Sequence, residues 1–333
     1  MLNGANEKTT GPTLIHVAVA GLTSVLLFAS PVAMGITAGA QQAAAPPAPM
    51  IRENATQKVA DHTWVIPDFD TVGVPNVGII VGSRATLVID TGMGPRNGEI
   101  VLRETMRVSR NAEMYLATTH IHPEHDLGAG AFPASTRMIR SRTQERDIAE
   151  SGLALAEQFS RNPVQAELLK GVQFRKADIS FDGDYALDLG GVRVRMTAVG
   201  PTHTVGDTVL FVEGDRVLFS GDVVMSAFPA VNPPGAAPTS SVRTWLAALD
   251  RLDAFMPTLV VPSHRRIGDA SMIAMYRDYF RTLQRRAAAL KREGKSADET
   301  ATLLQMEIAS TYPNTAGANR VGAAARIAYA EAP

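Results

Sequence analysis

Five of the seven histidines in this chain lie directly after predicted strands or in the turns just beyond them. A strand that ends in a tight loop can aim two side chains spaced like His120 and His122 at one point. Glu124 and His125 follow one turn later and can reach a second point close by. Two first-row metal ions that share a water molecule require a cluster of this kind. The spacing therefore predicts a metal site, and the five histidines are His120, His122, His125, His203 and His264.

The more distant candidate ligands also stand at the ends of predicted strands or in the turns between them. His203 lies in the glycine-containing loop GPTHT, Asp222 ends the run LFSGD, and His264 ends the run VVPSH. The chain has no cysteine, so it offers a metal neither a thiolate ligand nor a disulfide-bonded frame. Any zinc must be held by histidines and carboxylates.

In this order and combination the residues resemble the metallo-β-lactamase superfamily. The family signature is H-x-H-x-D-H after a strand, followed by a distant His, a distant Asp or Cys, and a last His. Asp90, which closes the run LVIDTG, matches the family's first motif. The resemblance extends from about residue 58 to about residue 266, and Asp90 is expected to orient a metal-binding histidine rather than to bind the metal itself.

The resemblance implies a zinc site with one or two ions per chain, and we expect two. His120, His122 and His203 would hold the first ion, Glu124, His125 and His264 the second, and Asp222 would bridge them. Glu124 and Asp222 are the candidate catalytic residues. One departure is notable, since Glu124 stands where the family has Asp. Its longer side chain puts the strength of the second site and the range of substrates in question.

The pattern of apolar residues predicts a β-rich part followed by a helix, a strand and a helix, and then the same order again. This order suggests two packed sheets with helices outside. The resemblance implies an α+β fold, the αββα four-layer sandwich. Strands are expected at 62–66, 77–81, 85–89, 114–117, 208–212, 216–219 and 258–261, with further strands within 172–196. Helices are expected at 97–108, 141–159, 242–255, 269–292, 297–310 and 320–330.

The N-terminal part has a different composition. Between Lys8 and Arg52 there is no Asp, Glu, Lys or Arg, and an apolar run ends in small residues around Ala38-Gly39-Ala40. This pattern predicts a cleaved signal peptide over 1–40 and a linker over 41–57, followed by the hydrolase domain with its C-terminal helices over 58–333. A periplasmic or secreted protein is expected, with no stable membrane insertion after cleavage. An uncleaved membrane anchor is the alternative.

The overall charge limits the class of partner. The formal net charge is −1, with 20% charged residues, and no basic run is present that would indicate nucleic acid. We therefore expect a small-molecule substrate and no nucleic-acid partner, while the oligomeric state is left open. Motifs of zincins, serine hydrolases and phosphate-binding loops are absent from the sequence.

These features predict an exported zinc-dependent hydrolase that attacks an amide, ester or thioester carbonyl with a hydroxide activated by the metal. Hydrolysis of a β-lactam ring is the leading specific activity. The alternatives are a lactonase, a glyoxalase II-like thioesterase, an iron-dependent redox member of the fold, or a binding protein with a degenerate site. The loops 67–75 and 227–241 are expected to flank the site, with Phe228, Pro229, Pro233 and Pro234 forming an apolar rim. The role of Asp207, a surface charge or a support for the site, is left open.

Overall fold

The computed structural model describes residues 48–231 and 240–333, which belong to one compact unit, Pro46–Pro333. The predicted signal peptide (1–40) and the first part of the predicted linker (41–47) lie outside the described residues. None of the helices in the described part of the chain is long and apolar enough to cross a membrane.

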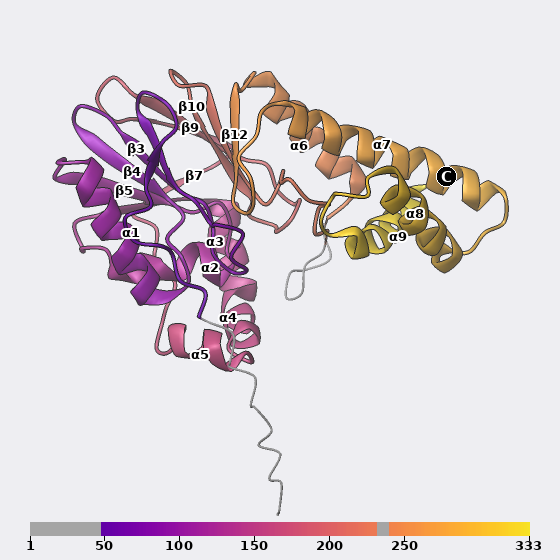
Figure 1. The fold of residues 1–333 in the computed structure, drawn as a ribbon, viewed down its shortest axis with the longest axis horizontal. Coiled ribbons are helices and arrows are strands. Elements are labelled where there is room, and N and C mark those ends of the chain that lie inside the picture. The colour runs from indigo at the N-terminus through magenta and orange to yellow at the C-terminus, as the bar shows by residue number, and fades with distance from the viewer. Residues whose placement is uncertain (1–47, 232–239) are drawn as a thin grey trace, which may run out of the picture. The chain divides into compact units, whose positions relative to one another are not determined.

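Two mixed sheets form the centre of this unit (Figure 1). The first sheet is antiparallel from β1 to β4 and parallel from β4 to β7. Its strands, in spatial order, are β1 (Gln57–Lys58), β2 (Thr63–Ile66), β3 (Val77–Val81), β4 (Ala85–Ile89), β5 (Glu113–Ala117), β6 (Arg137–Ser141) and β7 (Ile179–Phe181). The second sheet is antiparallel except where β12 joins β11. Its strands, in spatial order, are β12 (Leu259–Pro262), β11 (Val217–Gly221), β10 (Thr208–Val212), β9 (Arg193–Ala198) and β8 (Asp184–Asp188).

Helices cover the outer faces of both sheets, as Figure 1 shows for α1 on one side and for α6 and α7 on the other. The predicted αββα four-layer sandwich is thereby confirmed, and α8 and α9 pack beside α7. The helices of the first half are α1 (Gly94–Val108), α2 (Pro123–Asp126), η1 (Leu127–Ala131), α3 (Arg142–Asp147), the π-helical turn η2 (Ile148–Gly152), α4 (Leu153–Phe159) and α5 (Pro163–Leu168). Those of the second half are α6 (Val242–Ala254), α7 (Ser271–Arg292), α8 (Ala297–Thr311), η3 (Ala318–Arg320) and α9 (Val321–Glu331).

Side-chain alternation along the strands divides the core into layers. In β4, Leu87 and Ile89 face the second sheet, whereas Val88 faces outward with the cluster that includes α1. Gly78 in β3 allows the two sheets to approach closely, because a Cβ there would lie 2.5 Å from the ring of Phe219. A strand buried on both faces reads as a continuous apolar run, which is why the sequence revealed these strands readily.

Packing begins before residue 58, where the sequence placed the end of the linker. Ile51 is 3% exposed and joins the outer cluster of the first sheet. Its N–H donates to Asn97 Oδ1 at 2.8 Å, and Asn97 Nδ2 donates to the Pro49 carbonyl at 2.9 Å. The partners of these two hydrogen bonds are separated by 46 and 48 positions along the chain, respectively. No local sequence pattern could therefore predict the contacts.

The helix predicted over 141–159 begins one residue later and is interrupted. Ser141 ends β6, a strand that the sequence analysis did not predict, and its hydroxyl caps α3 by accepting a hydrogen bond from the Gln144 N–H at 3.1 Å. The strand was missed because its short sequence, RMIRS, carries an arginine at each end of its apolar centre. One of these arginines, Arg140, is fully buried and supports the site described below.

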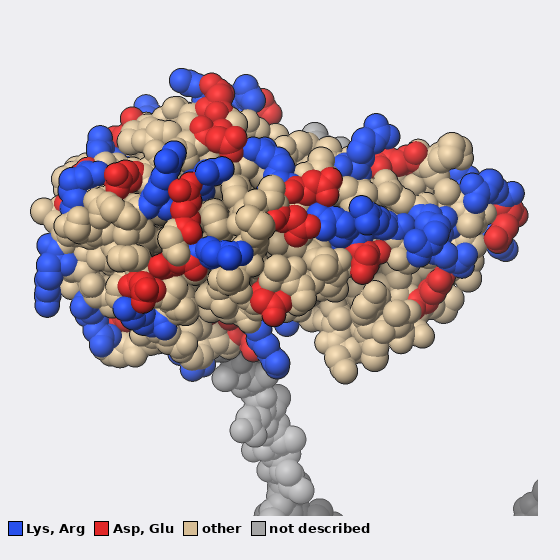
Figure 2. Space-filling view, turned by 90° about the horizontal axis from the view of Figure 1, so that it is seen from above, with Lys and Arg blue, Asp and Glu red and all other residues tan. Residues whose placement is uncertain are grey.

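Acidic and basic side chains lie side by side over much of the face drawn in Figure 2. Several oppositely charged side chains of the described residues form ion pairs. On α7, Arg277 pairs with Asp250 and Arg286 pairs with Glu307. Both pairs have a partner that is open to solvent, and ion pairs at the surface contribute little to stability, about 0–1 kcal/mol each.

Replacing Ile51 tests whether the segment before residue 58 is structural. Ile51→Ala should lower the free energy of unfolding by about 2–5 kcal/mol, because it removes a buried side chain from the core. Met106→Ala, at an exposed position on α1, is the control and should change it by no more than about 0.5 kcal/mol. Urea unfolding measures the free energy of unfolding of both variants. Equally small changes in the two would show that the segment before residue 58 does not contribute to the core.

Candidate metal centre

The first histidines of the site follow β5, a strand inside the parallel part of the first sheet. The chain leaves β5 at Ala117 and reaches His120 after two threonines. Asp90, at the end of the neighbouring parallel strand β4, accepts hydrogen bonds from the N–H of Thr119 at 2.7 Å and from its hydroxyl at 3.0 Å. Asp90 has a φ of 63°, in the left-handed region that few side chains adopt. The carboxyl ends of β4 and β5 are thus tied together beneath the histidines.

A single short helix, directly after the first pair of histidines, carries the next ligand candidates. Pro123 begins α2 at a position where a missing N–H costs nothing, and His122 precedes it in an extended conformation. One turn of helix places Glu124 and His125 beyond His122. The structure therefore directs His120 and His122 to one candidate metal position and Glu124 and His125 to a second, as the sequence spacing predicted.

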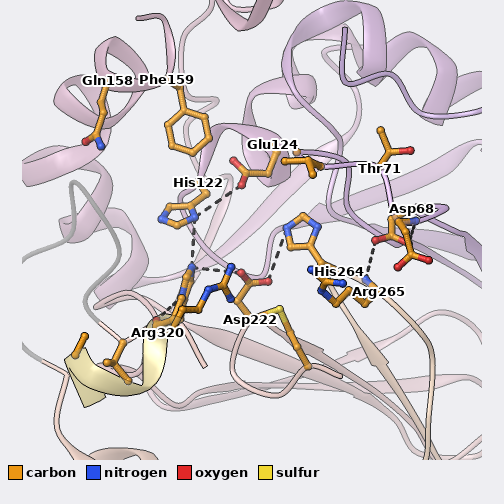
Figure 3. Close-up of a pocket in the computed structure, with 18 residues that line it drawn as sticks. Asp68, Thr71, His122, Glu124, Gln158, Phe159, Asp222, His264, Arg265 and Arg320 are labelled. Carbon is orange, nitrogen blue, oxygen red and sulfur yellow. Dashed lines mark hydrogen bonds and ion pairs between the residues drawn. The ribbon is translucent and has the colours of Figure 1, made fainter. Parts of the chain in front are cut away.

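All seven residues predicted to bind metal come together at one edge of the sandwich. They arrive from the ends of β5, β11 and β12 and from the loop before β10. Within each candidate group the ligand atoms lie within 4.8 Å of one another, and the groups are His120, His122 and His203; His120, His125 and Asp222; and Glu124, His125 and His264. Figure 3 shows His122, Glu124, Asp222 and His264 arranged around a common space.

The donor atoms of this cluster fit a metal. Several buried side-chain atoms have no hydrogen-bond partner among the residues that the structure describes, and they gather here: the Nε2 atoms of His120, His122 and His125, Glu124 Oε2 and Asp222 Oδ1. Buried polar atoms without partners are costly, by roughly 1–3 kcal/mol each. Imidazole nitrogens and carboxylate oxygens are ligands that zinc accepts. The residues therefore form a metal site of the His and Asp type.

Three histidines are oriented by hydrogen bonds on the side of the ring away from the cluster. His125 Nδ1 lies 2.9 Å from Asp90 Oδ2, as the expected orienting role of Asp90 requires. His203 Nδ1 donates to the Ala230 carbonyl at 2.9 Å, and His264 Nδ1 donates to the Val74 carbonyl at 2.8 Å. A donor at Nδ1 leaves Nε2 with a free lone pair for a metal.

Burial and mutual repulsion set the charges of the cluster. Burial, together with the neighbouring histidines, lowers the pKa of His120 and of His122 well below 6.5. Burial opposes the charged form of Asp222, but the surrounding imidazoles, His264 first, lower its pKa to about 2. Burial also opposes protonation of His125, yet the adjacent Asp90 raises its pKa to about 9. The neutral imidazoles of His120 and His122 beside the ionised Asp222 are in the forms that bind a cation, whereas a protonated His125 must lose its proton to bind one.

Asp207, whose role the sequence left open, supports the His203 loop. It is 1% exposed, and it accepts hydrogen bonds from the Thr202 hydroxyl, from the Thr204 N–H at 2.9 Å and from the Thr204 hydroxyl at 2.7 Å. Burial raises its pKa, whereas His203 and the threonine hydrogen bonds act in the opposite direction. The residues on both sides of His203 are thus fixed by one carboxylate.

A buried ion pair beneath α2 was missed by the sequence analysis. Arg140 Nη2 donates to Asp126 Oδ1 at 2.9 Å, and both side chains are almost completely buried. Arg140 Nη1 also donates to the Thr118 hydroxyl at 3.0 Å, and Gln144 Nε2 donates to the same hydroxyl at 2.9 Å. The only local signal was the acidic residue directly after His125. Its partner lies on the unpredicted strand β6, 14 residues further along the chain.

A pocket of about 500 Å³ opens over the cluster. The two loops expected to flank the site contribute to it through residues 68, 70–73, 230 and 231, as predicted. The apolar rim was predicted wrongly for Phe228, which is 1% exposed and packs against Tyr279, and Pro233 and Pro234 lie outside the described residues. Gln158 and Phe159 of α4 and Arg320 of η3 also line the pocket, and the sequence analysis had assigned them no part in the site (Figure 3).

Comparison with known proteins agrees with this geometry. A profile described as "Metallo-beta-lactamase superfamily" matches residues 70–264, more than half of the chain. A linear primary-alkylsulfatase of Pseudomonas sp. (strain ATCC 19151) is 24% identical over 216 residues, which are 56% of this chain and 40% of that protein.

Solved structures show the same fold. A stereoselective inverting sec-alkylsulfatase from Pseudomonas sp. superposes with a TM-score of 0.64 at 15% identity, over 83% of this chain and 49% of its own. A metallo-β-lactamase from Pontibacter korlensis superposes with a TM-score of 0.54 at 20% identity, over 68% of this chain and 98% of its own. The chain thus spans about half or less of the length of the alkylsulfatases that it matches.

Removing the charge of Glu124 tests its place in the cluster. Glu124→Gln should weaken binding of the second zinc ion by at least tenfold, because a neutral amide replaces a carboxylate among the candidate ligands, while the His120, His122 and His203 group is kept. Titration of the metal-free protein with zinc against a competing chelator measures stoichiometry and affinity. Glu157→Gln, at an exposed position on α4, is the control. Two ions bound with unchanged affinity in Glu124→Gln would exclude Glu124 as a ligand.

Proposed function

Because the chain belongs to the metallo-β-lactamase superfamily, we propose that it is a metal-dependent hydrolase of small anionic esters, with alkyl sulfate esters as the leading class. The observation that carries the substrate class is Arg320. This arginine lines the pocket from the end of η3 and forms no ion pair with any residue that the structure describes (Figure 3). A half-buried cation next to a metal centre attracts an anionic group.

The rest of the pocket fits an ester of this kind. Its apolar lining includes Phe159, Met225 and Val231, which can hold an alkyl chain. Arg265, three residues beyond the end of β12, adds a second cation. The volume of about 500 Å³ lies within the roughly 300–1,000 Å³ typical of small-molecule sites. The alkylsulfatase match over 83% of the chain supports the same choice.

The residues divide the chemistry between them. Zinc held by the cluster would activate water and polarise the bond to be broken. Arg320 would bind the sulfate group, and the apolar wall would fix the alkyl group, so that the ester is held over the cluster. Glu124 lines the pocket with an unpartnered Oε2, which positions it to accept a proton from the attacking water. Hydrolysis consumes one water and releases an alcohol and sulfate.

Hydrolysis of a β-lactam ring is the second candidate, because a β-lactam antibiotic also carries a carboxylate that Arg320 could bind. It ranks second because the β-lactamase from Pontibacter korlensis covers 68% of the chain, less than the sec-alkylsulfatase does. Export to the periplasm, which the N-terminal sequence predicts, would suit either substrate.

A substrate panel with the zinc-loaded protein tests the proposal. Hexyl and octyl sulfate should be hydrolysed faster than a chromogenic cephalosporin, a lactone and a thioester of similar size, as measured by alcohol release or absorbance. Loss of turnover after treatment with a chelator, and its return with added zinc, should accompany this. Rapid turnover of the cephalosporin with no release of sulfate from the alkyl sulfates would contradict the proposal and favour β-lactam hydrolysis.

Removing the charge of Arg320 tests how the substrate is recognised. Arg320→Gln should lower kcat/KM for octyl sulfate by about 10- to 100-fold, since a hydrogen bond between charged groups contributes about 1.5–3 kcal/mol. Turnover of a neutral ester should change much less. Arg266→Gln removes an exposed arginine that follows Arg265 in the sequence but does not line the pocket, and it should leave both rates unchanged. Equal losses for charged and neutral esters would contradict the role of Arg320.

A further inference from the structure

One loop connects the two sides of the metal centre. Residues 223–231, called here the bridging loop, follow Asp222 directly. Near its other end, the Ala230 carbonyl accepts the hydrogen bond from His203 Nδ1 at 2.9 Å. Met225, Ala230 and Val231 of the loop also line the pocket. The position of this loop therefore bears on two candidate metal ligands at once.

The bridging loop contains no helix or long strand that would fix its own shape. A buried tyrosine of α7 supplies part of the missing hydrogen bonding. The Tyr276 hydroxyl accepts from the Met225 N–H at 3.1 Å and donates to the Ala227 carbonyl at 2.8 Å. Tyr276 is 0% exposed, so water does not compete for these bonds.

Other contacts hold the same loop against the C-terminal helices. The ring of Phe228 lies 5.3 Å from that of Tyr279 and 6.1 Å from that of Tyr312, measured between ring centroids. The Phe228 N–H donates to the Ala316 carbonyl at 2.8 Å, and Arg320 Nη1 donates to the Phe228 carbonyl at 3.3 Å. The loop is thus docked on the helices through both its backbone and its side chain.

We propose that Tyr276 is a positioning residue of the metal centre. Its hydroxyl fixes the bridging loop, the loop presents the Ala230 carbonyl, and that carbonyl holds the ring of His203 with Nε2 toward the metal. The C-terminal helices would then form part of the metal site, although they supply no ligand. This inference rests on the metal-dependent function proposed above but is independent of the substrate class.

The chain offers a matched pair of variants. Tyr276→Phe removes both hydrogen bonds to the loop and keeps the ring. Tyr279→Phe removes a hydroxyl that is also buried on α7 but has no hydrogen-bond partner among the described residues. Each protein is prepared metal-free and titrated with zinc against a competing chelator. The cobalt-substituted forms are then compared by their visible spectra, which report the geometry around the metal.

Tyr276→Phe should bind zinc about tenfold more weakly and show an altered cobalt spectrum, since loss of an outer support typically costs 10- to 100-fold in metal affinity or activity. Tyr279→Phe should match the wild type in both measurements. Phe228→Leu loosens the same loop without removing a hydrogen bond, and it should shift affinity and spectrum in the same direction as Tyr276→Phe. Thermal unfolding of the metal-free proteins shows whether each variant is folded.

Equal zinc affinities and identical cobalt spectra for Tyr276→Phe and Tyr279→Phe would overturn the proposal. If Tyr276→Phe binds zinc more weakly while the wild type hydrolyses none of the tested esters, this inference is supported and the proposed substrate class fails. A wild type that binds no metal would overturn both.

Discussion

Burial of unpaired lone pairs at one edge of the sandwich is the constraint on which the rest of the site depends. Five imidazoles and two carboxylates meet there, and several of their buried atoms find no partner among the described residues. Such a cluster would be costly in a protein without a metal, because every buried polar atom loses its hydration. A bound cation satisfies all of these atoms together. The hydrogen bonds that Asp90, Val74 and Ala230 accept from the imidazoles hold those rings in place for it.

The sequence revealed those parts of the site that follow strands. His120 and His122 could be paired because a single residue separates them along the chain, and His264 could be added because it follows a buried strand by two residues. The strands themselves were readable, since a two-sided core leaves long apolar runs. Residues that support the ligands from distant parts of the chain could not be predicted from local sequence patterns. Arg140 reaches Asp126 from a strand whose short apolar centre is flanked by two arginines, and its pairing depends on the parallel order of β5 and β6.

Glu124 illustrates the limit of a motif as a guide to geometry. The sequence showed only that a longer carboxylate stands where the family has Asp. In the structure its Oε1 lies 3.9 Å from His125 Nε2 and 4.0 Å from His122 Nδ1, between residues of the two candidate groups. The extra methylene therefore does not carry the carboxylate out of the cluster. It leaves Oε2 unpartnered beside the pocket, so one side chain has access both to a metal and to a substrate.

The C-terminal helices contribute to the site in a way that neither their sequence nor their distance along the chain suggested. Their apolar faces join the outer face of the second sheet in one continuous cluster that includes Trp245, Phe228 and Phe280. Phe228 belongs both to that cluster and to the bridging loop. The packing that stabilises the helices therefore also fixes the loop beside the candidate metal site. Arg320 is placed in the pocket by the same packing, at the end of η3 and directly before α9. Differences in such helical additions can therefore change the charge and shape of the pocket while the histidines at the strand ends stay in place.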